Sequence, residues 1–185
     1  FFAVAIVITT IMVYLFSGSV MLTLLPIACS LIAVIWQMGM LTVLGFGIDP
    51  MSILVPFLIF AIGVSHGVQM INATGKNVAL GMDAKTAAQA SFRKLLIPGG
   101  IALLSDTVGF ITLLIIEIGV IRELAITASL GVGIIILTNL ILLPVLMSYV
   151  KFSDKYKKKV QTPHPRIEKF WYGLSAFATP KYAVV

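Results

Sequence analysis

The chain has 185 residues, of which 59% are hydrophobic and only 11% are charged, and its mean hydropathy is +1.09. Soluble domains carry about 25% charged residues, so this composition excludes an ordinary soluble domain and indicates a membrane protein. The net charge of +6 does not indicate nucleic-acid binding, because eight of the thirteen Lys and Arg residues follow Val150, beside an apolar run. That placement is typical of a cytoplasmic anchor on anionic lipid.

Five apolar stretches are candidates for membrane spans, since a transmembrane helix needs about 20 mostly apolar residues. The first is short, and Pro26 is expected to kink the second or to mark its start. The sequence therefore predicts an all-α fold, a polytopic membrane helix bundle over residues 1–150, with helices at about 1–16, 20–46, 51–73, 95–116 and 124–150.

The segments outside the spans are basic and partly amphipathic. Residues 82–94 carry Ala, Lys and Gln at helical spacing, which predicts a short amphipathic helix on the cytoplasmic surface. Residues 151–179 are interpreted as a basic cytoplasmic connector with an interfacial helix over 165–178. Residues 180–185 resemble the start of a further span, so we expect the sequence to be a piece of a longer protein.

Loop charges predict the orientation of the spans. The loop from Thr74 to Lys94 holds four Lys and Arg residues, whereas the loops on the other side hold only Arg122. Because Lys and Arg concentrate on the cytoplasmic side, the first span should run inward and the fifth should end inside. An odd number of spans satisfies both conditions, which supports a multi-pass protein with five spans here.

The third predicted span carries a polar stripe. Ser65, Gln69 and Asn72 fall within an arc of about 60°, with His66 about 60° beyond Gln69. Lipid cannot satisfy these groups, so the stripe must face protein or water. Two interpretations stay open: a packing helix that hydrogen-bonds to its neighbours, and a functional site inside the membrane.

Asp106 lies near the middle of the fourth predicted span, between Ser105 and Thr107. Counted from the expected cytoplasmic ends, His66 and Asp106 differ in depth by about 6 Å, so we expect the two side chains to meet. Burial disfavours the charged form of each group and mutual attraction favours it, a balance that permits proton exchange near neutral pH. The pair would be a proton relay with Ser65 and Gln69, or else a fixed structural pair.

Other polar residues are assigned supporting roles. Asn72, Ser105, Thr107 and Asn139 are expected to hydrogen-bond within the bundle, with packing favoured over function for Asn139. The sequence shows no nucleophile–base set, no metal-ligand spacing and no phosphate-binding loop. We therefore expect no enzymatic activity, no catalytic residue, no metal and no cofactor.

Three long segments carry a resemblance to a known family: "GFGIDPMSILVPFLIFAIGVSHGVQMIN", "FRKLLIPGGIALLSDTVGFITLL" and "IRELAITASLGVGIIILTNLILLPVL". Together with the basic linker they resemble the resistance–nodulation–division (RND) superfamily, and within it the MmpL-like and sterol-sensing-domain-like exporters. The resemblance covers essentially the whole chain. It implies spans two to six of a six-span half-transporter and the connector to span seven, without the large periplasmic domain.

The resemblance implies proton-driven export of lipids or other hydrophobic molecules across a bacterial-type inner membrane. The family usually has an acidic residue where this sequence has the pair Ser65–His66, and small or hydroxyl residues where it has Asp106. We infer that the carboxylate has moved to the neighbouring helix, with His66 as its partner. The open alternative is that only the second half carries the relay.

Two functions follow as hypotheses. The first is a proton-driven exporter, and the alternative is a sterol-sensing-like lipid-binding module that regulates or scaffolds a partner. A contact between His66 and Asp106 would favour the exporter, whereas their separation together with a lateral lipid groove would favour the module. Expected partners are membrane lipids, a hydrophobic substrate, and the remaining half with its periplasmic domains; homo-oligomerisation stays open, and no nucleic acid is expected.

Overall fold

The structure, a computed structural model, describes residues 1–46 and 53–161, and every regular element in those ranges is helical. This confirms the all-α membrane bundle. Residues 162–185, which include the predicted interfacial helix 165–178 and the start of a further span at 180–185, lie outside the described residues. The elements are α1 (Phe2–Ser17), α2 (Val20–Val43), α3 (Leu54–Ala79), α4 (Ala84–Thr112), η1 (Leu113–Ile115), α5 (Gly119–Ile135), η2 (Ile136–Leu142), α6 (Leu143–Met147) and α7 (Asp154–Gln161).

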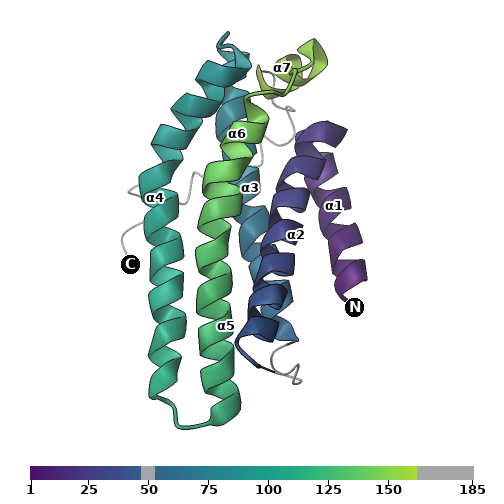
Figure 1. Ribbon diagram of the computed structural model, residues 1–185. Helices are drawn as coiled ribbons and strands as arrows, with labels where there is room; N and C mark the ends of the chain where they lie inside the picture. Colours follow the sequence, from purple (N-terminus) through teal and green to yellow (C-terminus); the bar gives the residue numbers. More distant parts are fainter. Residues whose placement is uncertain (47–52, 162–185) are drawn as a thin grey trace, which may run out of the picture.

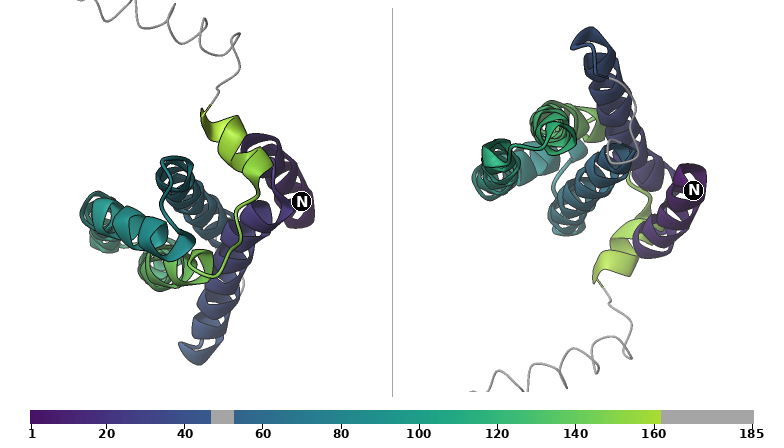
Figure 2. Two further views of the ribbon diagram at one scale, coloured as in Figure 1. Left: turned by 90° about the horizontal axis from the view of Figure 1, so that it is seen from above. Right: turned by 90° about the horizontal axis from the view of Figure 1, so that it is seen from below.

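The helices run alternately up and down, with α3 at the centre of the bundle (Figure 1). α3 contacts each of the other α-helices, whereas α1 and α4 lie at opposite edges (Figure 2). Within the described ranges, four segments are long and apolar enough to cross a membrane: α2, α3, α4 with η1, and the continuous segment from α5 to α6. α1 is apolar but shorter.

The charges of the described residues separate the two ends of the bundle. Arg122, whose Nε donates to the Ile116 carbonyl oxygen at 3.2 Å, is the one Lys or Arg of the described part near the turn from α4 to α5. The other cations lie toward the opposite end, with the turn from α3 to α4 and with α7. By the positive-inside rule we expect this second end to be cytoplasmic, and we call it the cytoplasmic end.

α3 and α4 form a long hairpin, which differs from the sequence prediction. The expected surface helix 82–94 and the expected span 95–116 form one continuous helix, which includes Pro98. The helix extends through the linker because Ala, Lys and Gln are good helix formers. Asp83 caps this helix by accepting from the Thr86 backbone N–H at 3.1 Å. α3 also continues beyond the predicted end at residue 73, to Ala79.

The last long segment contains a stretch of π-helix, η2, which the prediction of a plain span at 124–150 did not include. Pro144 lies two residues after the end of η2, in the first turn of α6. A proline ring clashes with the carbonyl four residues earlier and supplies no N–H, so the wider π geometry accommodates it without breaking the helix. Thr138 and Asn139 lie inside η2, and both side chains are buried.

Two apolar clusters hold the bundle together. One surrounds Ile59, Leu103 and Val132, and the other joins Met70, Leu143 and neighbouring side chains near the cytoplasmic end. Glycine permits a close contact between α2 and α3, because a Cβ on Gly67 of α3 would lie 2.5 Å from the Pro26 Cβ of α2. Close approach at small residues is the usual way membrane helices gain packing energy.

Candidate functional site

The polar stripe of α3 lies on the outside of the bundle. Ser65, Gln69 and Asn72 are all exposed, while the opposite side of the helix packs into the core. His66, next to this stripe, is half-buried, and its Nδ1 donates to the Ile62 carbonyl oxygen at 3.0 Å. The predicted polar stripe is therefore present on the surface of α3, and no helix of the described part of the chain covers it.

The predicted contact between His66 and Asp106 is wrong. Within the described residues no ion pair or hydrogen bond joins them, and Asp106 is exposed. The His66 ring instead lies beside Gly99, whose Cβ position would be 3.9 Å from the His66 Cδ2. Asp106 follows Gly99 by seven residues on the same helix, which places it about 10 Å further along the axis.

The physical reason is the length of the hairpin helices. His66 lies 13 residues before the end of α3, and Asp106 lies 22 residues after the start of α4. At 1.5 Å per residue these positions are about 20 Å and about 33 Å from the hairpin turn. Depths counted from the ends of the shorter predicted helices differed by only about 6 Å, and a contact was expected for that reason.

The supporting polar residues have different surroundings. Ser105 is exposed beside Asp106, and the Thr107 hydroxyl donates to the Leu103 carbonyl oxygen at 2.9 Å. Asn139 is 1% exposed: its Nδ2 donates to the Thr138 Oγ1 at 3.1 Å, and the Ser30 hydroxyl donates to its Oδ1 at 3.5 Å.

Buried polar residues of α2 were not singled out from the sequence. Ser30 and Gln37 are both almost fully buried, and neither polar atom of the Gln37 amide has a partner among the described residues. They are seven residues apart, on one face of a helix, and this spacing was a signal that could have revealed them. Within the described ranges no three His, Cys, Asp or Glu side chains lie close enough to hold a metal ion.

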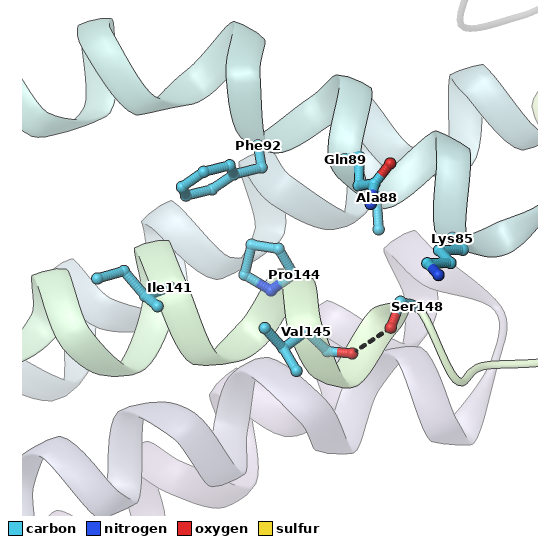
Figure 3. A pocket seen from close by; sticks show the side chains of 8 residues that line it. All are labelled: Lys85, Ala88, Gln89, Phe92, Ile141, Pro144, Val145 and Ser148. Carbon is cyan, nitrogen blue, oxygen red and sulfur yellow. Dashed lines mark hydrogen bonds between the residues drawn. The ribbon is translucent and has the colours of Figure 1, made fainter.

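A groove of about 290 Å³ lies between α4 and the segment that ends in α6 (Figure 3). We call this the α4–α6 groove. Its walls are mostly apolar, and its polar side chains lie toward the cytoplasmic end of the bundle. The lining residues are Lys85, Ala88, Gln89, Phe92, Ile141, Pro144, Val145 and Ser148.

The groove forms between two rows of side chains, one on α4 and one on the segment that ends in α6, and each row follows helical spacing. On α4, Lys85, Gln89 and Phe92 follow an i, i+4, i+7 pattern, so they share one face. Across the groove Val145 and Ile141 are partly exposed, and the Ser148 hydroxyl donates to the Val145 carbonyl oxygen at 2.6 Å. The result is a slot with an apolar end and a polar end, a shape suited to an amphiphile.

Comparison with known proteins places the chain in a family. The family model described as "Sterol-sensing domain of SREBP cleavage-activation" matches residues 2–162, which is most of the sequence. Neither the curated proteins nor the solved structures compared with the chain give a match. The matched range includes every helix that the structure describes, from α1 to α7, and leaves out residue 1 and residues 163–185. With its multi-pass helical bundle, the chain belongs to the sterol-sensing domain family.

Proposed function

We propose that this chain is a membrane lipid-binding module of the sterol-sensing type, without enzymatic activity, that takes a lipid into the α4–α6 groove. The groove carries the proposal, since it joins apolar walls around Phe92 and Ile141 to polar side chains at Lys85 and Ser148. Ligand sites usually combine mostly apolar lining with a few placed polar groups. The separation of His66 from Asp106 supports this function over a relay inside the bundle.

Blocking the groove tests the proposal. Val145 lines the groove and is 51% exposed, so Val145→Trp should fill it without disturbing the core. The matched control is Leu137→Trp, at a residue 52% exposed that does not line the groove. With a photoactivatable sterol and a photoactivatable phosphatidylcholine in nanodiscs, we expect labelling of groove peptides to be lost in the first variant and kept in the second. Equal labelling of both variants, or none in the parent chain, would contradict the proposal.

A second candidate is the transmembrane part of a proton-driven RND-type, MmpL-like exporter in a bacterial-type inner membrane. The exposed polar residues of α3 and of α4 support it. In the most apolar stretch of α4 only 11% of the residues are buried. In the corresponding stretches of α2, α3 and α5–α6 the buried shares are 50%, 44% and 56%. An Asp106 carboxylate cannot face lipid without a partner, so this face would meet the remaining half of the transporter or water.

In this second candidate His66 and Asp106 would exchange protons with groups supplied from outside the bundle, and Ser65 and Gln69 would be hydrogen-bonding members of the relay. The periplasmic domains would select the hydrophobic substrate. The test is proton-driven efflux of a hydrophobic fluorescent dye by the whole protein. Asp106→Asn should abolish the proton dependence, whereas Glu117→Gln, at an exposed carboxylate beyond η1, should leave it unchanged. Full proton-driven efflux in Asp106→Asn would exclude a relay role for this carboxylate.

A further inference from the structure

We propose that the α4–α6 groove holds one acyl chain of an anionic phospholipid from the cytoplasmic leaflet, with the Lys85 ammonium group against the headgroup phosphate. This inference rests on the lipid-binding function proposed above and adds the class of lipid, its leaflet and the residue that selects its charge. Four properties of the groove support it: its polarity gradient, its depth, its size and its charge.

The polarity of the groove changes along its length. Lys85 and Ser148 lie at one end, and Phe92 and Ile141 lie at the other (Figure 3). On α4, Lys85 precedes Phe92 by seven residues, a separation of about 10 Å along the helix axis. An amphiphile bound along this slot would place its chain against Phe92 and its headgroup at Lys85.

The depth of the groove matches the boundary between headgroups and hydrocarbon. The apolar run of α4 begins at Leu95, directly after Arg93 and Lys94. Phe92 therefore lies at the edge of the hydrocarbon layer, and Lys85 lies about 10 Å beyond it, at headgroup level. Since this end of the bundle carries nearly all the described cations, the leaflet is the cytoplasmic one.

The size of the groove favours part of a lipid over a whole one. Its volume of about 290 Å³ is at the low end of the range of ligand sites, which is roughly 300–1,000 Å³. One chain can enter while the second chain stays in the bilayer. A pocket of similar volume, about 280 Å³, lies among α1, α2 and α3, but its lining is entirely apolar, with Phe2, Met38 and Phe57 among its residues, and offers no group for a headgroup.

The charge at the mouth of the groove selects an anion. Lys85 is exposed, and within residues 1–46 and 53–161 no carboxylate forms an ion pair with it. The nearby Asp83 carboxylate accepts from the Thr86 backbone N–H and thus caps its own helix. Basic pockets between membrane helices on the cytoplasmic side suit phosphate headgroups.

The test compares two lipids that share photoactivatable acyl chains, phosphatidylglycerol and phosphatidylcholine, with the full chain in nanodiscs. In the parent chain we expect groove peptides to be labelled more by phosphatidylglycerol. Lys85→Gln should lower this preference about five-fold, and Lys94→Gln, at an exposed lysine of the same helix outside the groove, should leave it unchanged.

The outcomes separate the two proposals. Equal labelling of the groove by both lipids, or a preference that Lys85→Gln does not change, overturns the inference about the anionic headgroup and leaves the lipid-binding function intact. Absence of groove labelling by both phospholipids overturns the inference, and absence of labelling by the photoactivatable sterol as well overturns both proposals. Elution of each variant at the parent's volume in size-exclusion chromatography establishes that the charge substitutions leave the fold intact.

Discussion

The ring of Tyr156 in α7 occupies the space that a side chain on Gly75 of α3 would fill. A Cβ placed on Gly75 would lie 3.0 Å from the Tyr156 Cζ, and the tyrosine is only 8% exposed. The Gln161 Nε2 also donates to the Ala79 carbonyl oxygen at 2.6 Å. These two contacts attach α7 to the cytoplasmic end of the central helix.

The first prediction concerns Gly75→Ala. The added methyl group overpacks the contact with Tyr156, which should cost about 1–3 kcal/mol and release α7. Hydrogen exchange of residues 154–161 should become faster while the spans stay protected. Gly133→Ala is the control, since a Cβ there meets nothing within 4 Å and should stabilise the helix by up to about 1 kcal/mol. Unchanged protection of α7 in Gly75→Ala would contradict the account.

The second prediction concerns pH. Burial raises the pKa of the Tyr156 hydroxyl, so the docked state disfavours the phenolate. Docking of α7 is then fully stable below the ordinary tyrosine pKa of about 10 and weakens as pH rises above it, through the raised pKa of the docked state. Hydrogen exchange of α7, corrected for its intrinsic pH dependence, should show this loss. Tyr156→Phe should remove the loss, and the same profile in that variant would refute the assignment.

The third prediction concerns the close approach of α2 and α3. Gly67→Ala should lower the free energy of unfolding by about 1–3 kcal/mol, because the rigid Pro26 ring cannot move aside as a flexible side chain would. Thermal unfolding in detergent measures the change. Gly109→Ala, where a Cβ would be in open space, is the matched control. A Gly67→Ala variant as stable as this control would show that the helices are further apart than described.

The fourth prediction concerns the buried amide of Asn139. Asn139→Ala should cost about 1–3 kcal/mol, since it removes the buried amide that accepts from the Ser30 hydroxyl and donates to the Thr138 Oγ1. Thr42→Val on the exposed face of α2 should change the stability little. Chemical unfolding of both variants in the same detergent compares them. If the two substitutions have equal effects, the Asn139 network does not stabilise the bundle.

The sequence was sufficient to predict the helical bundle and the polar stripe, because apolar length and helical spacing are local properties. The stripe of Ser65, Gln69 and Asn72 is a real face of α3, although nothing in the described bundle covers it. Helix ends were less predictable. The Ala- and Lys-rich linker was predicted as a separate surface helix, but in the structure it is the first part of α4 and continues into the span. Because α4 is longer than predicted, Asp106 lies further from His66 along the helix axis.

The groove and the π-helix could not be predicted in the same way. The i, i+4, i+7 pattern of Lys85, Gln89 and Phe92 is visible in the sequence, but its partner stripe on the last span lies more than 40 residues later, near Ser148. Pairing the two stripes depends on how far each helix extends beyond the bilayer. The π geometry likewise depends on how Pro144 packs, and not on its presence alone.

Mapping where a lipid crosslinks to the protein shows whether the α4–α6 groove binds lipid. With a photoactivatable phosphatidylglycerol in nanodiscs, peptide mass spectrometry should place the label on residues 85–92 of α4 and 141–148 of the last span. Label spread evenly over the exposed surfaces of α1 and α2, with none between α4 and α6, would show that the groove takes no lipid.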